Sequence, residues 1–194
     1  MKRVGIFGGS FDPVHNAHLA LAQVAMAQLQ LAQVRWVPTG QPSQKTRNLA
    51  DAADREAMVR LAIAAEPRFV LDRSEVRRRG ISYTLDTVRE LNAAHHGTRW
   101  FLILGQDQYA GLHTWRDWRE LLGFVTLAIA NRPGAGLVAD DQVARAAHEV
   151  VTLPMMEISS TDVRRRVAAG ESIAELVPAS VARYIERHGL YNRS

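Results

Sequence analysis

A pair of glycines followed closely by two histidines is the part of this sequence best suited to chemistry. Gly8 and Gly9 end a short apolar run, and His15 and His18 follow three residues apart. Paired glycines let the backbone approach a ligand closely, and the amino-terminus of a helix beginning near His18 favours an anion. Each histidine taken alone is better explained as an ordinary surface residue. Their combination at the end of a first strand predicts a site for phosphoryl oxygens.

A second possible anion site lies near the carboxyl-terminal end of the chain. Ser159, Ser160 and Thr161 come just before a predicted helix that also carries Arg164. Hydroxyl groups and free N–H groups at a helix start can hold phosphate oxygens, and an arginine adds positive charge. Taken alone, however, this segment is better explained as a plain helix N-cap with solvated arginines.

The elements that must position these residues alternate between strand and helix. Apolar runs predict strands at residues 4–7, 34–37, 69–71, 100–104, 124–130 and 150–153. Helices are predicted at residues 18–31, 51–65, 85–94, 115–122, 140–148, 159–169 and from Pro178 to Gly189, with a loop at 41–48. This alternation predicts an α/β fold with a parallel sheet and right-handed crossovers. Ligands of such sheets bind beyond the carboxyl ends of the strands, which is where Gly8 and Gly9 lie.

Composition and spacing exclude several classes of protein. The 194 residues include 24 Lys+Arg and 20 Asp+Glu, and no cysteine is available for disulfides, thiolate zinc sites or nucleophilic catalysis. Gly5, Gly8 and Gly9 do not form the G-x-G-x-x-G dinucleotide fingerprint. No apolar run approaches the roughly 20 residues of a membrane span, and the amino-terminal run is too short for a signal peptide. We therefore expect a cytoplasmic protein without a membrane partner.

The basic residues favour a phosphorylated small molecule over nucleic acid as the ligand. The net charge is only +4, and the basic side chains are scattered along the chain. A nucleic-acid-binding protein would more often concentrate them on one stripe. All but two of the basic residues are arginines, the exceptions being Lys2 and Lys45. Lys45 lies in the predicted loop and is a candidate for a compact ammonium near phosphate, with chance as an equal alternative.

Several motifs in the right order resemble those of a known superfamily. Residues 8–18 resemble the H-x-G-H signature of nucleotidyltransferases, and residues 158–164 resemble the I-S-S-T-x-x-R motif of the same enzymes. Residues 82–84 (S-Y-T), residues 103–107 with Trp115 beyond them, and the ending at 176–191 resemble bacterial nicotinate-nucleotide adenylyltransferases. The resemblance therefore covers nearly the whole chain. It departs from the family at Ala17, which replaces the glycine of H-x-G-H, and at Gln44, which replaces a histidine before Lys45.

This resemblance implies a fold, a reaction and partners. The fold would be a Rossmann-like, doubly wound parallel sheet flanked by helices. Residues 1–194 would form a single nucleotidyltransferase domain, with a helical portion at about 159–194 completing the phosphate site. The implied reaction transfers AMP from ATP, accompanied by Mg²⁺, to nicotinate mononucleotide, giving nicotinate adenine dinucleotide and pyrophosphate. The alternatives are a same-fold enzyme that uses nicotinamide mononucleotide or phosphopantetheine, or a non-catalytic nucleotide sensor. The oligomeric state is not predicted.

The resemblance also implies roles for individual residues. His15 and His18 are the expected catalytic residues. The residues expected to bind ATP or its phosphates are Gly8, Gly9, Ser10, Phe11, Lys45, Asp107, Ser159, Ser160, Thr161 and Arg164. Those expected to bind nicotinate mononucleotide are Ser82, Tyr83, Thr84, Trp115 and Arg132. An indole face suits an electron-poor pyridine ring, although Trp115 is also explained as an anchor of its predicted helix. No metal-ligating protein residues are predicted, and no cationic residue is assigned to the nicotinate carboxylate.

Overall fold

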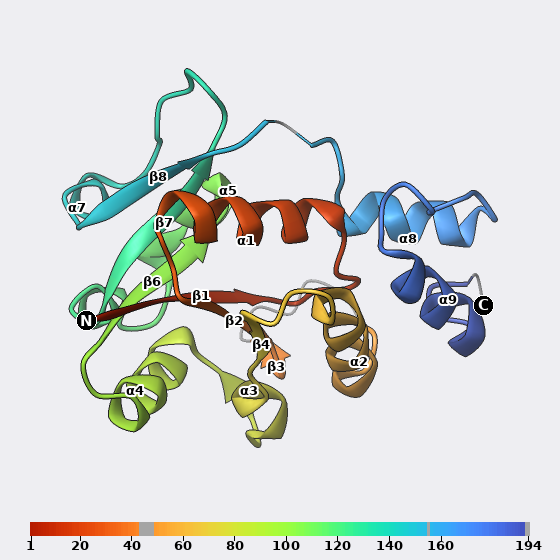
Figure 1. Ribbon diagram of the computed structural model, residues 1–194, viewed down its shortest axis with the longest axis horizontal. Helices are drawn as coiled ribbons and strands as arrows, with labels where there is room; N and C mark the ends of the chain where they lie inside the picture. Colours follow the sequence, from red (N-terminus) through yellow and green to blue (C-terminus); the bar gives the residue numbers. More distant parts are fainter. Residues whose placement is uncertain (43–48, 155, 193–194) are drawn as a thin grey trace.

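Six parallel strands form the central sheet of the computed structural model, which describes residues 1–42, 49–154 and 156–192 (Figure 1). The strands are β1 (Lys2–Gly9), β2 (Gln33–Pro38), β4 (Phe69–Leu71), β6 (Thr98–Leu104), β7 (Val125–Asn131) and β8 (His148–Thr152). They lie in the order β4-β2-β1-β6-β7-β8, and every neighbouring pair is parallel. Because the order reverses between β1 and β6, the carboxyl ends of these two strands flank the switch point of a doubly wound sheet. The predicted fold is confirmed.

Helices cover both faces of this sheet. Figure 1 shows α1 (Asn16–Gln28) along one face and α4 (Thr84–Ala94) along the other. Consecutive strand residues point to opposite faces, so Phe101 and Ile103 of β6 pack into the cluster that contains α1, while Leu102 and Leu104 pack into the cluster that contains α4. The remaining helices are α2 (Ala52–Ile63), α3 (Ser74–Arg77), α5 (Gln106–Ala110), the 3-10 helix η1 (Leu112–Thr114), α6 (Trp118–Leu121), α7 (Asp141–Ala144), α8 (Ser160–Ala168) and α9 (Ala179–His188).

The last two helices lie beyond the end of the sheet at which β1 finishes, at the right of Figure 1. Val163 of α8 and Val181 and Ile185 of α9 belong to the same buried cluster as Phe101. The backbone N–H of Asn16, the first residue of α1, donates to the carbonyl of Leu176 at 2.9 Å. The carboxyl-terminal segment is therefore packed directly behind the turn that follows β1.

A second, two-stranded sheet joins two loops beside the same turn. β3 (Gln41–Pro42) pairs in parallel with β5 (Ile81–Ser82). Just before β3, a Cβ atom on Gly40 would lie 2.1 Å from the carbonyl oxygen of Glu75, so this close approach requires a residue without a side chain. The residues predicted as a loop at 41–48 thus begin with a short strand, and positions 43–48 are outside the described residues.

Two predicted helices differ from those observed. The helix predicted at 115–122 begins only at Trp118, because Trp115 is extended and Asp117 adopts a left-handed conformation with φ of 51°. The helix predicted at 140–148 is the short α7, and His148 is the first residue of β8. The short helices α3 and α5 were not predicted, because helices of four or five residues leave little periodicity in a sequence.

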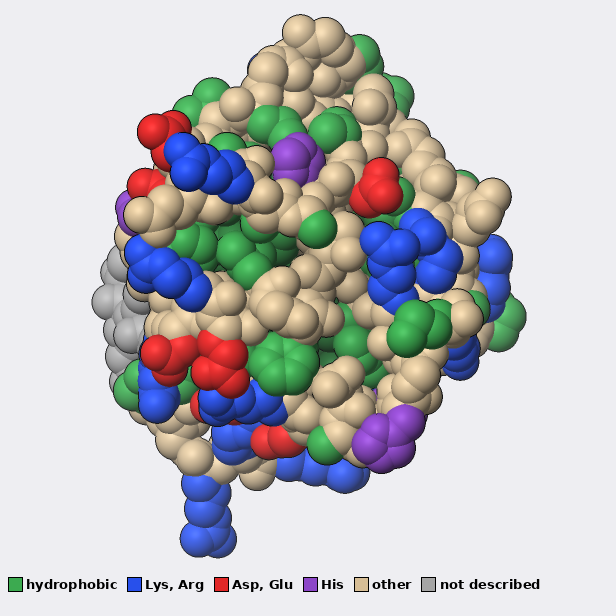
Figure 2. Space-filling model, turned by 90° about the vertical axis from the view of Figure 1, so that its left-hand side faces the viewer, with side chains coloured by type: hydrophobic (Ala, Val, Ile, Leu, Met, Phe, Trp, Pro, Cys, Tyr) green, Lys and Arg blue, Asp and Glu red, His purple; other side chains and the backbone are tan. Residues whose placement is uncertain are grey.

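Two further expectations concern the distribution of basic side chains on the surface and the presence of a membrane span. At the face where the chain starts, Lys and Arg side chains are scattered among acidic and apolar ones rather than gathered into one stripe (Figure 2). Across the described part of the chain, no helix combines the length and hydrophobicity that crossing a membrane requires.

Candidate active site

The turn after β1 is folded over an aromatic base. Phe11 has a left-handed backbone, with φ of 47°, and its side chain is only 2% exposed. Its ring packs against Phe7 and Trp36, with centroids 5.5 and 5.4 Å apart. A Cβ atom on Gly9 would lie 3.2 Å from the Phe11 ring, which is tighter than most side chains accept. Phe11 therefore supports the glycine turn from behind and leaves the backbone of Gly8 and Gly9 facing the ligand side.

The two predicted histidines lie together at the start of α1. Their rings are stacked, with centroids 3.6 Å apart and planes at 22°. The backbone N–H of His15 donates to Nδ1 of His18 at 3.1 Å, so the neutral His18 ring carries its proton on Nε2. That Nε2–H has no acceptor among the residues described. Ala17, between the two, is the second residue of α1.

Both histidines are neutral near pH 7. Burial lowers the pKa of His15 to about 4. Burial also lowers the pKa of His18 well below its usual value, and the nearby charge of a protonated His15 lowers it further. The stacked pair is thus a pair of neutral hydrogen-bonding groups, and Nδ1 of His15 is buried with no partner in the described structure. A negatively charged ligand at this place would favour protonation and offset the cost of burying that charge.

We expect His15 to make the stability of the protein depend on pH. A histidine with a folded pKa of about 4 and an unfolded pKa of 6.5 binds fewer protons when folded between these values. The free energy of unfolding should therefore fall as the pH drops through this window, by up to about 3 kcal/mol from His15. Urea unfolding at several pH values should show a shallower dependence in His15→Gln than in the wild type. An unchanged dependence would contradict the burial of a neutral His15.

The predicted residues of α8 are attached to the same turn. The Ser160 hydroxyl donates to the carbonyl of Pro13 at 2.9 Å. Arg164 donates to the carbonyl of Asp12 at 2.7 Å and to the Thr161 hydroxyl at 3.1 Å. These side chains hold the amino-terminal ends of α8 and α1 close together. Because the first N–H groups of a helix have no intrahelical acceptor, two helix starts then converge on one place.

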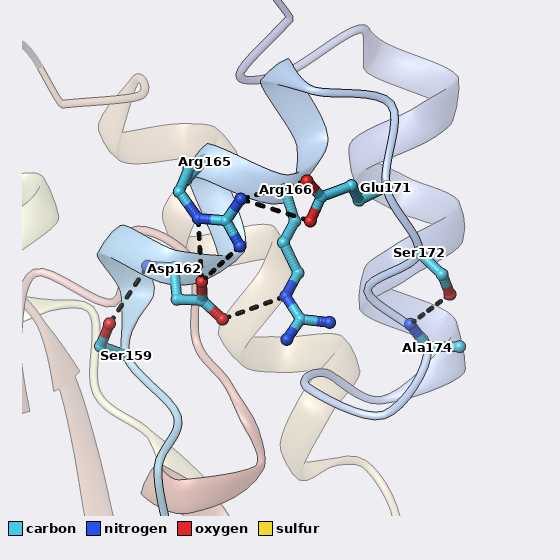
Figure 3. A network of polar contacts seen from close by, with 7 residues as sticks. All are labelled: Ser159, Asp162, Arg165, Arg166, Glu171, Ser172 and Ala174. Carbon is cyan, nitrogen blue, oxygen red and sulfur yellow. Dashed lines mark hydrogen bonds and ion pairs between the residues drawn. The ribbon is translucent and has the colours of Figure 1, made fainter.

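Ser159 and the two arginines after Arg164 have local partners. The Ser159 hydroxyl accepts from the backbone N–H of Asp162 at 3.1 Å, which is the bond of a helix N-cap. Asp162 also accepts from Arg165 and Arg166, and Arg165 pairs with Glu171 (Figure 3). Of the three consecutive arginines, Arg164 is thus the one for which a contact with the β1–α1 turn is seen.

Asp12 joins the turn to the end of the chain, a contact that was not predicted. Its buried carboxylate accepts from the Tyr191 hydroxyl at 2.6 Å and from the backbone N–H of Ala50 at 3.2 Å. Burial and the hydrogen bond to Asp12 raise the pKa of Tyr191, so the hydroxyl remains a donor. Asp12 and Tyr191 both lie in segments that resemble the family. Because they are far apart in the sequence, no local pattern predicts the hydrogen bond between them.

Arg55 of α2 is a further residue that was not predicted, and it connects three loops. Its guanidinium is 2% exposed and donates to the carbonyls of Ser10 at 2.8 Å, Thr39 at 2.7 Å, Gly40 at 3.0 Å and Ala50 at 2.9 Å. A signal for its burial exists in the sequence. Arg55 lies three and four residues before the buried Met58 and Val59, on the same helix face.

Arg55→Met should lower the free energy of unfolding by about 2–4 kcal/mol, because buried carbonyl oxygens lose their donors. Arg55→Lys should recover only part of this loss, since an ammonium cannot reproduce the planar fork of a guanidinium. Urea unfolding at neutral pH measures both variants, and exposed Arg60 on the same helix is the control as Arg60→Met. A change of under about 0.5 kcal/mol in Arg55→Met would show that the loops hold without it.

A cavity of about 610 Å³ lies at the switch point. Its volume suits a nucleotide-sized ligand. It is lined by seven of the predicted residues, Gly8, Gly9, Ser10, Ser82, Tyr83, Thr84 and Trp115. Gln108, Thr114, Arg116, Glu75 and Thr87 line it as well and were not predicted. The structure thus brings the glycine turn and the S-Y-T segment, which are far apart in the sequence, into the lining of one cavity.

Other predicted residues lie outside this lining. Asp107 is exposed in the first turn of α5, and Arg132 is exposed after β7, where its backbone N–H donates to Asn131. Phe11 is buried beneath the turn. His15, His18 and the residues of α8 gather at the turn itself. Lys45 lies outside the described residues.

The fold and the site define a class of protein. The family described as cytidylyltransferase-like matches residues 6–166, which contain the glycine turn, both histidines and the cavity wall. Among solved structures, nicotinic acid mononucleotide adenylyltransferase of Plasmodium falciparum complexed with NaAD superimposes with a TM-score of 0.80 at 18% identity, over 98% of both chains. A likeness at this identity supports the fold.

Curated relatives narrow the class. A protein of Methylibium petroleiphilum is 46% identical over 98% of this chain and 92% of its own length, and one of Bordetella petrii is 49% identical over 98% of this chain and all of its own length. Both carry the name "probable nicotinate-nucleotide adenylyltransferase". The chain therefore belongs to the nicotinate-nucleotide adenylyltransferase family, and the resemblance found in its motifs is confirmed.

Proposed function

We propose that this chain transfers AMP from ATP to nicotinate mononucleotide, in the cytoplasm, and releases nicotinate adenine dinucleotide and pyrophosphate. The observation that carries the proposal is the cavity at the switch point, which is lined by the glycine turn after β1 and by the aromatic side chains of Tyr83 and Trp115. The names of the curated relatives agree with it. The contacts of Ser160 with Pro13 and of Tyr191 with Asp12 support one catalytic unit that includes α8 and α9.

In the proposed reaction, a phosphate oxygen of the mononucleotide attacks the α-phosphorus of ATP. A new P–O bond forms there while the bond from the α-phosphorus to the bridging oxygen of the β-phosphate breaks, and pyrophosphate leaves with that oxygen. The attacking phosphate is already largely ionised near neutral pH, so no general base is required. The protein then contributes positioning and stabilisation of the charge that develops on the transferred and leaving phosphates.

The turn after β1 would supply that stabilisation. Nε2–H of His18 is a donor aligned by the bond that its Nδ1 accepts, and Nδ1 of His15 is a buried group that still lacks a partner. The N–H groups at the start of α1 and α8 add partial positive charge at the same place. We assign the phosphates of ATP to this end of the site and the roles of binding and charge stabilisation to His15 and His18.

The other end of the cavity would hold the nicotinate. Trp115 and Tyr83 supply aromatic surface for the pyridine ring. α4 begins at Thr84, and Tyr83 does not cap it with its side chain. The N–H of Asp86 donates to the carbonyl of Tyr83, so the N–H groups of Thr84 and Leu85 remain for a ligand. A carboxylate at this helix start would be favoured by the helix dipole.

We propose that Mg²⁺ arrives with ATP, bound mainly to the triphosphate. In the part of the chain that the structure describes, no three His, Cys, Asp or Glu side chains lie together as a metal site. Asp12 accepts hydrogen bonds from Tyr191 and Ala50, and Asp107 is exposed in the first turn of α5. The chemistry that Mg²⁺ supplies is neutralisation of the phosphate charge.

Pyrophosphate release tests the proposed function. The purified chain is given Mg-ATP with nicotinate mononucleotide, nicotinamide mononucleotide or phosphopantetheine in separate reactions. We expect rapid release with the first alone. Rapid release with another acceptor would make that acceptor the substrate. ATP binding without pyrophosphate release in any of the three reactions would favour a nucleotide sensor.

A further inference from the structure

Arg116 brings positive charge to the aromatic end of the cavity. Among the residues that line the cavity it is the one Lys or Arg, so far as the described residues extend. It directly follows Trp115, and its guanidinium carbon lies 4.5 Å from the centroid of the Tyr83 ring. The cation therefore sits over the residue that immediately precedes α4.

The local backbone holds Arg116 in this place. Trp115 is extended, Asp117 is left-handed and buried Trp118 starts α6, so the chain makes a sharp turn at Arg116. The side chain of Arg116 also pairs with Asp117 at 3.3 Å, but these two side chains are 57% and 56% exposed. Such an exposed ion pair contributes little to stability, so Arg116 can exchange Asp117 for the anionic group of a ligand.

We propose that Arg116 binds the carboxylate of the nicotinate ring and thereby selects the acid over the amide. This inference rests on the proposed function. A guanidinium forms a charge-assisted hydrogen bond with a carboxylate and only a weaker one with a neutral carboxamide. The guanidinium lies over the ring of Tyr83, the N-cap residue of α4. The positive end of the α4 dipole would add to the potential that a carboxylate meets there.

The acidic residue of the lining, Glu75, already has a hydrogen-bond donor of its own. Glu75 is buried and accepts a hydrogen bond from the Thr87 hydroxyl at 2.8 Å. Burial raises the pKa of Glu75. The pyridine end of the cavity thus favours a ligand that carries a negative charge.

Arg116→Gln, with Arg116→Lys as a conservative variant, tests this assignment. Kinetics are measured with nicotinate mononucleotide and with nicotinamide mononucleotide at saturating Mg-ATP. For Arg116→Gln, we expect kcat/KM for the acid to fall by about 10- to 100-fold while that for the amide changes less than about threefold. Arg116→Lys should recover part of the preference. The KM for ATP should not change.

Arg119→Gln is the matched control. Arg119 also lies over an aromatic ring, with its guanidinium carbon 4.4 Å from the centroid of Trp118, but it does not line the cavity. The Arg119→Gln substitution removes the same charge from the same segment, and kcat/KM should stay unchanged for both acceptors. Equal losses for acid and amide in Arg116→Gln would place Arg116 at the mononucleotide phosphate and overturn the proposal, as would no loss for either.

Calorimetric binding separates this inference from the proposed function. Nicotinate mononucleotide and nicotinamide mononucleotide are titrated into the wild type and Arg116→Gln without ATP. If the wild type binds the acid more tightly than the amide and Arg116→Gln does not, the role of Arg116 is supported. Absence of turnover in the wild type would contradict the proposed function and leave the role of Arg116 intact. Turnover with an acid preference that survives in Arg116→Gln would contradict only the inference.

Discussion

His18→Ala is expected to lower kcat by about 100- to 1,000-fold, the loss typical of removing one donor to a developing negative charge. The reason is geometric. Nδ1 of His18 already accepts the backbone N–H of His15, so Nε2–H is the part of the ring left for a phosphate oxygen. The loss should appear in kcat more than in KM, because the donor matters most when charge builds up in the transition state.

Two further variants separate this chemical role from a structural one. In His18→Asn, the side-chain oxygen can replace Nδ1 as acceptor at the start of α1, which should restore stability but little turnover. In His18→Gln, the longer amide can replace Nε2–H as donor, which should restore more turnover. Steady-state kinetics and urea unfolding are measured for all three variants. Parallel losses of activity and stability across the series would make His18 a structural residue.

Trp115→Ala is expected to raise the KM for nicotinate mononucleotide by about 10- to 100-fold, in line with the loss of one ring-stacking contact. The KM for ATP should stay within about threefold of the wild-type value, because Trp115 is assigned to the pyridine ring and the phosphates of ATP to the turn after β1. Trp115→Phe should recover much of the loss. An effect confined to ATP would contradict the assignment of the pyridine ring to Trp115.

Trp118 is the matched comparison for Trp115. It is buried, belongs to the core cluster of α4 and β6, and does not line the cavity. Trp118→Ala should therefore reduce the free energy of unfolding by about 3–5 kcal/mol. The partly exposed Trp115 should show a much smaller change in the same urea titration.

The parts of the site that were predicted from the sequence are those whose signals are local. The glycine pair, the two histidines and the buried strand before them follow one another within a single strand–turn–helix unit, so their proximity needs no tertiary information. The alternation of strands and helices likewise predicts the sheet, because each strand and each helix has its own local signal in the sequence. The S-Y-T segment and Trp115 were placed only through resemblance, and the cavity now brings them to the glycine turn.

The parts that were not predicted depend on contacts between distant segments. The bond from Tyr191 to Asp12 and the four bonds from Arg55 join elements whose spacing leaves no pattern in the sequence. The helix predicted across Trp115 fails because Asp117 takes a left-handed conformation that propensity disfavours and packing of Trp118 maintains. The same turn places Arg116 in the lining of the cavity.

Hydrogen bonds from distant segments keep the turn after β1 in place. Arg55 holds the loops after β1 and β2 from one side, while Arg164 and Tyr191 hold the turn from the other. A reaction that needs no general base depends mainly on such positioning. We therefore expect the turn after β1 to supply most of the catalytic effect, and the residues around Trp115 to select the acceptor.

A competition between the two acceptors measures which mononucleotide the protein adenylylates. Equal concentrations of nicotinate mononucleotide and nicotinamide mononucleotide are mixed with Mg-ATP and the enzyme, and the dinucleotide products are resolved by mass spectrometry while pyrophosphate is counted. We predict that nicotinate adenine dinucleotide predominates and equals the pyrophosphate released. Predominance of the amide dinucleotide, or loss of ATP without either dinucleotide, would contradict the account.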